Sequence, residues 1–394
     1  MRLQLTKMLW FRWVGVALCL FVPAGVQAAE DTEEQKKTIS GDASARVDVY
    51  RDPNLLVIAP AIHMSLEPVE RLDLDVNYGV QFVSGATPAL VADTADVVSS
   101  ATPFVEQRHS ADLSATGEVR DKLLLGGSYF LSVERDFMAH GLGVSLSGDA
   151  FKSMATLAAA YNVSVQRAWT ATDEAISEMA VEQNVDLSWV QILSKSTRLT
   201  ALGSVQLSLC GDVLGCHANP YRYVAMLADD DVLFALREHH PENRVRSSAA
   251  LRLSQSLHRN VALHMGYRFY GDSWKVTGHT GDLALAVAFF DQRLILRGEG
   301  RGSWQGAASF YRDEYVVDPA TPSRHSYYTA DRELSGLWDI SAGLRLSFAS
   351  YGVGPFRVLD ARLRLAHTWF RYPNYSEMPK RNAWLFGGGV QGEF

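Results

Sequence analysis

The sequence predicts an outer-membrane β-barrel of about 16 antiparallel strands, within a range of about 14 to 18. Three observations lead to this fold class. The chain ends in an alternating strand that finishes at Phe394, it begins with a leader typical of exported proteins, and the residues between them alternate between apolar and polar. A strand left unpaired in lipid would expose backbone groups at several kcal/mol each, so the last strand must pair with the first.

The final strand, expected at 382–394, separates its side chains onto two faces. One face is apolar, with Trp384, Phe386, Val390 and Phe394, and the other carries Arg381, Leu385, Gln391 and Glu393 among glycines. An amphipathic last strand ending in Phe is what the barrel-assembly machinery recognises. We therefore expect Phe394 to be the assembly signal.

Residues 1–28 are predicted to be a signal peptide. The basic residues Arg2, Lys7 and Arg12 precede an apolar run at 13–22, and Val26-x-Ala28 fits a signal-peptidase site. The apolar run is shorter than the roughly 20 residues that a membrane-spanning helix needs. A polar periplasmic lead-in would follow at 29–43, and the barrel would occupy 44–394.

Period-two alternation runs through the rest of the chain. At 72–82, for example, Leu, Val, Tyr and Phe alternate with Asp, Asn and Gln. The expected strands are 44–51, 55–66, 71–84, 104–117, 121–135, 139–149, 152–167, 182–194, 197–209, 244–257, 259–271, 274–289, 292–304, 333–349, 356–372 and 382–394. A soluble sandwich also alternates, but polar faces this heavily charged favour a barrel with an aqueous interior.

The connections between these strands alternate in length. Every second one is short, as at 67–70 and 118–121, whereas the other series includes the long segments 85–103, 168–181, 210–243, 305–332 and 373–381. Short periplasmic turns and longer extracellular loops are typical of outer-membrane barrels, and an even strand count returns both ends to the periplasm. Region 210–243 is long enough for an extra hairpin.

The composition argues against a nucleic-acid partner. The formal net charge is −7, and it becomes −10 once the three basic residues of the leader are removed, so no basic face is expected. Beyond the leader only Cys210 and Cys216 remain, with glycines between them. In an oxidising periplasm we expect a local disulfide. A metal-binding pair is the alternative, although the spacing is not that of a zinc knuckle.

Several segments resemble a known family. They are Asp96-Val-Val-Ser-Ser-Ala-Thr-Pro103, Pro220-Tyr-Arg-Tyr-Val224, His240-Pro-Glu-Asn-Arg-Val-Arg246, Tyr267-Arg-Phe-Tyr-Gly-Asp-Ser-Trp274, His279-Thr280, Ala308-Ser-Phe-Tyr311 and Tyr328-Thr-Ala-Asp-Arg-Glu-Leu334. From about residue 44 to 394 the chain is similar to uncharacterised Gram-negative outer-membrane barrels, known only as a domain of unknown function. Ser100 stands where members usually carry Gly. The resemblance implies barrel architecture and outer-membrane location, and no established activity.

The polar faces of the expected strands carry opposite charges. The later strands offer Arg244, Arg246, Arg252, Arg268, Arg293, Arg297, Arg301, Arg345, Arg362 and Arg364, and the early strands offer Asp73, Asp75 and Asp112. Closed into a ring, they would form a basic wall opposite an acidic one, which focuses anions along one side of a pore. The alternative is local pairing that fills the lumen, as Glu299 between Arg297 and Arg301 indicates.

Other features have both a functional and a structural interpretation. Loop 85–103 suits a constriction or an ordinary extracellular loop. Aromatic residues near strand ends suit an interfacial girdle, namely Tyr267, Phe269, Trp274, Tyr311, Tyr327, Tyr328, Trp369 and Tyr372, while inward Tyr270 suits sugar stacking. Asp229-Asp230-Asp231 suits a solvated loop tip or a calcium site. His239, His240 and Glu242 lack the spacing of a helical metal site, so we expect no metal and no cofactor.

No nucleophile elbow, phosphate loop or His-Glu-x-x-His occurs, so we expect no enzyme. The sequence predicts a porin-like channel for polar, preferentially anionic, solutes in the outer membrane of a Gram-negative bacterium. One alternative is the barrel of an export system, for example for polysaccharide, working with a periplasmic partner. Another is a structural barrel with a filled lumen. The expected partners are outer-membrane lipid and the barrel-assembly machinery.

Overall fold

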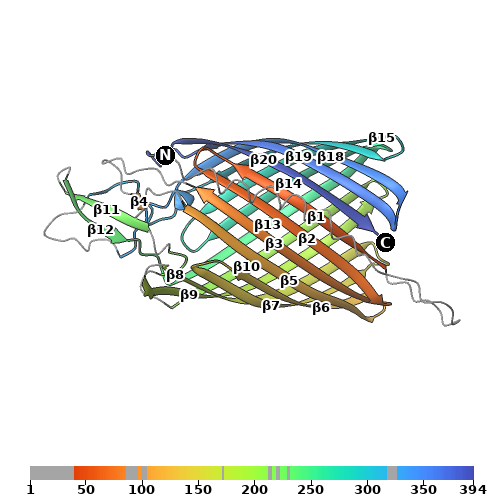
Figure 1. Ribbon diagram of the computed structural model, residues 1–394, viewed down its shortest axis with the longest axis horizontal. Coiled ribbons are helices and arrows are strands. Elements are labelled where there is room, and N and C mark those ends of the chain that lie inside the picture. Colours follow the sequence, from red (N-terminus) through yellow and green to blue (C-terminus); the bar gives the residue numbers. More distant parts are fainter. Residues whose placement is uncertain are drawn as a thin grey trace, which may run out of the picture. The chain divides into compact units, whose positions relative to one another are not determined.

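The chain forms a closed barrel of sixteen antiparallel strands in the computed structural model (Figure 1). The structure describes residues 40–85, 96–98, 104–170, 173–211, 215–218, 222–228, 231–316 and 326–394. In ring order the strands are β1 (Ser40–Arg51), β2 (Leu55–Val69), β3 (Leu72–Gly85), β5 (Phe104–Arg120), β6 (Leu123–Val133), β7 (Phe137–Ala150), β8 (Ala155–Thr170), β9 (Asp173–Ser194), β10 (Thr197–Cys210), β13 (Asn243–His258), β14 (Val261–Asp272), β15 (Thr277–Phe289), β16 (Leu294–Gln305), β18 (Leu337–Val353), β19 (Phe356–Arg371) and β20 (Lys380–Glu393). Ring order follows chain order throughout.

Pairing between β1 and β20 closes the ring. The register runs from Asp42 opposite Glu393 to Arg51 opposite Trp384. Beyond it, the Gly41 N–H donates to the Phe394 carbonyl at 3.2 Å, and the Phe394 N–H donates back to Gly41 at 3.0 Å. A Cβ on Gly41 would lie 2.3 Å from the Ser65 carbonyl oxygen, so a side chain at this position would force the backbone apart. The strand that ends the chain therefore seals the barrel.

The sixteen strands agree with those expected from the sequence, with bounds shifted by a few residues in most cases. The largest difference is β9, which begins at Asp173 instead of residue 182, because its first residues continue the ladder with the end of β8. The extra hairpin in region 210–243 is present as β11 (Arg222–Ala228) and β12 (Asp231–Arg237), outside the ring. Residues 40–43, expected in the lead-in, belong to β1, and the signal peptide lies outside the described residues.

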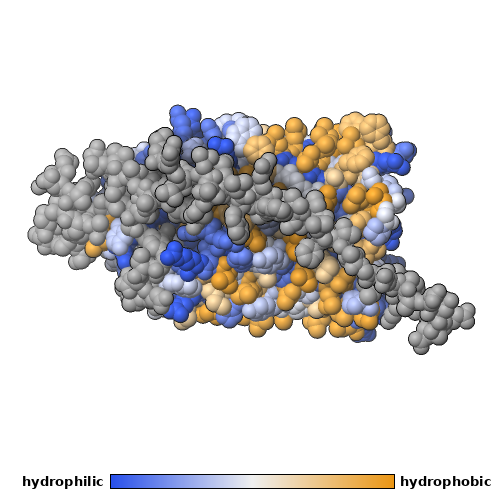
Figure 2. Space-filling model, viewed as in Figure 1, coloured by the Kyte–Doolittle hydropathy of each residue, from blue (hydrophilic) through white to orange (hydrophobic). Residues whose placement is uncertain are grey.

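The outer face of the barrel is apolar. Leu142, Leu251 and Leu363 are 63%, 54% and 61% exposed, as expected for side chains in contact with lipid. Figure 2 shows the corresponding hydrophobic surface over the barrel strands. In the described residues no helix has the length and hydropathy needed to cross a membrane, and η1 (Arg332–Leu334) is a single turn.

The aromatic girdle is present with changed membership. Tyr267, Phe269 and Trp369 are exposed on the outer face, as predicted. Trp274, Tyr311 and Tyr372 are only 3%, 5% and 1% exposed, so their assignment to the girdle was wrong. Trp304, Trp338 and Trp384 are exposed toward ends of the barrel strands and belong to the same outer set. Aromatic rings at this level are typical of the lipid–water interface.

The face assignment can be tested at the middle of β19. Leu363→Arg puts a charge into lipid and should cost about 2–4 kcal/mol of folding free energy, measured by denaturant titration of the refolded protein in vesicles. The matched control Ala349→Arg puts the same charge into the lumen from the neighbouring strand, opposite the carboxylate of Asp360, and should change stability little. A silent Leu363→Arg with an Ala349→Arg that fails to fold would mean that the register is off by one residue.

Candidate functional site

The long connections gather at one end of the barrel, which the short turns at the other end identify as extracellular (Figure 1). Outside the ring, β11 pairs with β12 on one side, and with β17 (Tyr315–Val316) and β4 (Asp96–Val98) on the other. Apart from β4, the proposed constriction loop after β3 lies outside the described residues. So do Asp229 and Asp230 of the acidic run.

Asp272 anchors the extracellular ends of β13 and β14. Its carboxylate, with no exposed surface, accepts hydrogen bonds from Arg244 Nε at 2.9 Å and from Tyr270 Oη at 3.0 Å. It also accepts the backbone N–H groups of Trp274 and Val276, and the Arg244 guanidinium lies 4.0 Å from the Trp274 ring centre. A carboxylate so fully satisfied fixes the turn. Arg244 and Tyr270, considered for lumenal roles, are committed to this contact.

A buried core lies under the extracellular loops. It contains Cys210, Cys216, Trp274, Val276, Ala308, Tyr311 and Leu334. The Trp274 ring meets Phe310 edge-on at 5.1 Å, and Tyr311 Oη donates to the Asn374 carbonyl at 2.6 Å. Four of the core residues, Trp274, Ala308, Tyr311 and Leu334, come from segments that carried the family resemblance. Those segments therefore build the cap of the barrel, a structural role that sequence spacing did not indicate.

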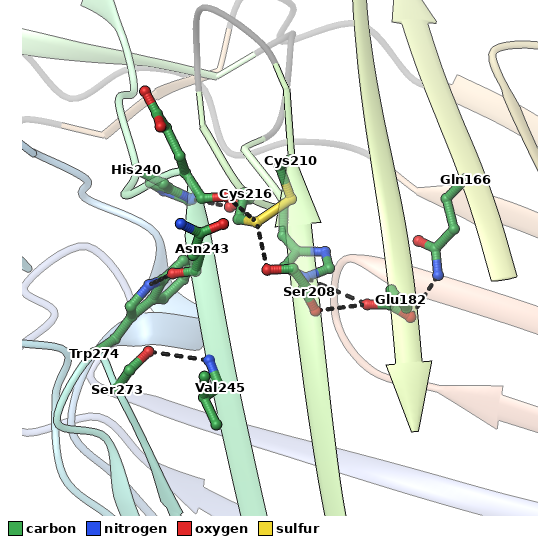
Figure 3. The surroundings of a disulfide bond; sticks show 12 residues. Gln166, Glu182, Ser208, Cys210, Cys216, His240, Asn243, Val245, Ser273 and Trp274 are labelled. Carbon is green, nitrogen blue, oxygen red and sulfur yellow. Dashed lines mark hydrogen bonds and ion pairs between the residues drawn. A yellow bond between two sulfur atoms is a disulfide. The ribbon is translucent and has the colours of Figure 1, made fainter. Parts of the chain in front are cut away.

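Cys210, the last residue of β10, forms a disulfide with Cys216 (Figure 3). Next to it, His217 Nε2 lies 3.4 Å from Glu182, which also accepts hydrogen bonds from Ser208 at 3.1 Å and Gln166 at 2.6 Å. Ser208 and Glu182 point into the lumen from β10 and β9, so the loop contacts the inner wall. Burial, and then the charges of Arg246 and Arg244, lower the pKa of His217 to about 3.

His240 is buried beside the same disulfide. Its Nδ1 donates to the Cys216 carbonyl at 2.9 Å, and its ring lies 5.2 Å from Trp274 and 5.5 Å from Phe310. The pair His239 and His240 does not converge with Glu242 on a metal-sized space. Among the described residues the one cluster of possible metal ligands is Cys210, Cys216 and His217, and its two sulfur atoms are bonded to each other.

Three lumenal arginines converge on Glu299. Arg297, Arg345 and Arg364 lie opposite one another on β16, β18 and β19. Arg364 and Arg345 contact the Glu299 carboxylate at 3.0 and 3.1 Å, and Arg297 lies 3.8 Å away. One negative charge shared among three permanent positive charges leaves this part of the wall with a positive surplus. Side-chain exposures of 40% and 39% for Arg345 and Arg364 leave room for an anion to reach them.

Glycines in the same part of the wall let these charged side chains lie flat. A Cβ on Gly343 would lie 3.2 Å from Glu299 Oε1, and one on Gly387 would lie 2.6 Å from Asp48 Oδ1. Gly387 is the register partner of both Arg364 and Asp48. The missing side chains at Gly343 and Gly387 therefore leave the space that the carboxylates of Glu299 and Asp48 occupy.

The other arginines of the predicted wall divide into paired and unpaired groups. Arg362 contacts Asp360 at 2.9 Å, and Arg246 lies 3.8 Å from Glu182. Arg293 lies at a periplasmic turn over the Tyr351 ring. Arg252, Arg268 and Arg301 are exposed inward, and within the described part of the chain none of them forms an ion pair. Local pairing, the alternative weighed from the sequence, applies to some arginines and not to these three.

The acidic residues of the early strands lie across the ring. In ring order β3 is third and β14 is eleventh, so the two are eight strands apart and face each other. Asp73 and Asp75 on β3 and Asp112 on β5 share the inward face, and Asp75 accepts a hydrogen bond from Ser114. None of the three forms an ion pair within the described residues. The lumen thus has an acidic wall opposite Arg268.

A recess of about 440 Å³ lies in the lumenal wall between β7 and β14. Its floor is made of small side chains, among them Ala158, Ala160, Ser188, Ser204, Ser248 and Ala250. Asp186 lies on β9 between the floor residues Ala160 and Ser204, and Arg252 and Arg268 line the recess from β13 and β14. The volume suits a small ligand. The sequence did not indicate this recess, because small residues on four strands form it only after the register is known.

A closed ring, a lipid-facing apolar surface and a charged interior define the class: an outer-membrane β-barrel of a Gram-negative bacterium. Within this class, the chain belongs to the family described as "Protein of unknown function (DUF3570)", whose model matches residues 13–353. The match agrees with the resemblance to an uncharacterised barrel family. A comparison with curated proteins finds no match.

Solved structures with a similar arrangement include three proteins of Pseudomonas aeruginosa, of which OprD is described as an outer membrane protein. OccD3 (OpdP) has a TM-score of 0.47 at 10% identity, covering 91% of this chain and 92% of its own. OprD has a TM-score of 0.45 at 8% identity, covering 94% of this chain and 98% of its own. OccK11 (OpdR) has a TM-score of 0.43 at 10% identity, covering 90% of this chain and 96% of its own. Similarity at this level concerns the fold alone.

The low pKa of His217 predicts that the loop around this residue becomes less stable as the pH falls. The pKa of His217 is 6.5 in the unfolded loop and about 3 in the folded loop, so between these pH values the unfolded loop binds a proton more readily than the folded one. Loop stability is greatest above pH 6.5 and falls as the pH drops toward 3. Between pH 7 and about 4, amide protection in 215–242, measured by hydrogen exchange with correction for intrinsic rates, should fall about tenfold or more.

The control is His217→Asn, which cannot take up the proton. Its protection at 215–242 should change little over the same pH interval. An equal fall in His217→Asn and in the unmodified protein would assign the pH dependence to other groups.

Proposed function

We propose that the barrel is a passive channel for small polar solutes and that its lumenal arginines favour anions. The observation that carries this proposal is the positive surplus on the β13–β19 wall. Arg252, Arg268 and Arg301 have no ion pair among the described residues, and three further arginines share Glu299. Charges of one sign along a low-dielectric wall concentrate solutes of the opposite sign.

The chemistry of the wall indicates the solute class. Guanidinium groups stay charged at every relevant pH and bind carboxylate, sulfate or phosphate through paired hydrogen bonds. The recess adds serine hydroxyls on its floor and the Asp186 carboxylate on β9, which is two strands away from Arg252 on β13. A small hydroxylated carboxylate fits this arrangement, with its acid group on Arg252 and Arg268 and its hydroxyls on the floor.

The cap favours small solutes over polymers. The disulfide-bonded loop contacts Glu182 on the inner wall, and the buried core around Trp274 holds the adjoining loops. A mouth narrowed by packed loops suits a diffusing monomer better than an extended polysaccharide chain. This supports the channel over the export alternative.

Proteoliposome swelling with three solutes of hexose size tests the proposal. Glucuronate should enter several-fold faster than glucosamine, with glucose between them, because only charge differs appreciably among them. The variant Arg252→Gln/Arg268→Gln/Arg301→Gln should lose the preference for glucuronate and keep glucose entry. The control Arg259→Gln, in the turn between β13 and β14, should behave as the unmodified protein. A folded barrel that admits none of the solutes, or all at equal rates, contradicts the proposal.

A further inference from the structure

Two positive side chains oppose each other on the outer face, where the ladder of β19 and β20 ends. Arg371 and Lys380 are register partners, both exposed, on the same face as Leu363 and Leu365. The next backbone hydrogen bond, from Tyr372 to Pro379, closes the extracellular loop. Like charges directly opposite across two strands destabilise a sheet. Neither residue forms an ion pair within the described part of the chain.

Aromatic rings surround this pair on the barrel side. Trp338 is the other register partner of Arg371, whose guanidinium lies 5.7 Å from the ring centre. Closer to the periplasm on β19, the ring centre of His367 lies 4.3 Å from the ring centres of both Trp369 and Trp384. Exposed Trp residues mark the lipid–water interface. The two cations therefore lie at the level of the lipid headgroups of the outer leaflet.

We propose that Arg371 and Lys380 bind the phosphate group of an outer-leaflet lipid. A guanidinium offers a planar pair of donors to phosphate oxygens, and an ammonium adds a compact charge on the other side. A phosphate between them turns the repulsion across the strands into two favourable ion pairs. The acyl chains of the same lipid would lie on the apolar surface of Leu363, Leu365 and Phe386, directly below the aromatic rings.

The occupant is a lipid and not a free anion because of where the pair lies. Both side chains are on the outer face, continuous with the aromatic rings and the apolar surface, and away from the lumen. A soluble phosphate would gain nothing from the rings or from the leucines. The site is also independent of the channel, so either proposal can fail without the other.

Thermal unfolding of the refolded protein in detergent tests the site, with three additions compared. The first is lipid A, which carries phosphate groups, the second is lipid A with its phosphates removed, and the third is inorganic phosphate. We expect lipid A alone to raise the midpoint, and native mass spectrometry to show it bound. Arg371→Gln/Lys380→Gln should lose most of the shift, and Lys380→Gln about half.

The matched control is Lys195→Gln/Arg259→Gln, which removes two exposed cations at the periplasmic turns of neighbouring strands. It should keep the full shift. An equal shift from the dephosphorylated lipid, an equal shift from inorganic phosphate, or unchanged lipid A binding by the outer-face variants would overturn the proposal. Lys380→Gln alone keeps the test valid even if the double variant folds poorly.

Discussion

Pairing between the first and last strands is the constraint on which the rest of this structure depends. In lipid no water is available for a free strand edge, so the ring must close before any face can be assigned. The reciprocal hydrogen bonds between Gly41 and Phe394 complete that closure at the periplasmic end. Once the register of β1 against β20 is set, period two fixes which side chains meet lipid and which meet the lumen.

The inner face uses the same residue type for two purposes. Arg244 is bound to the buried carboxylate of Asp272 and packs on Trp274, where it holds the cap together. Arg252 and Arg268 line an open recess and have no ion pair among the described residues. Burial decides between these roles, since a buried arginine must be paired whereas one in an aqueous lumen is solvated and free to meet a solute. The number of arginines available to a solute is therefore smaller than the number of arginines that point into the lumen.

The strands could be predicted from sequence because alternation is a local pattern repeated over a ring of consecutive neighbours. The burial of Trp274, Tyr311 and Tyr372 could not be predicted from sequence. An aromatic residue at a strand end gives the same sequence pattern whether its side chain contacts lipid or a loop that folds over it. The contacts of Glu299 could be predicted only in part. The sequence shows Arg297 two residues before it on β16, whereas Arg345 and Arg364 come from other strands. The recess depends on the register of several strands and left no signal in any one of them.

An open lumen with a positive bias must make the unmodified protein anion-selective in a planar bilayer, so its reversal potential is the measurement to make first. With a KCl gradient across the bilayer, we expect stable conductance steps and a reversal potential of the sign set by chloride. Its magnitude should shrink as salt screens the wall. Stable steps with cation selectivity would contradict the role given to the arginines. A correctly folded barrel without conductance would contradict the open lumen itself.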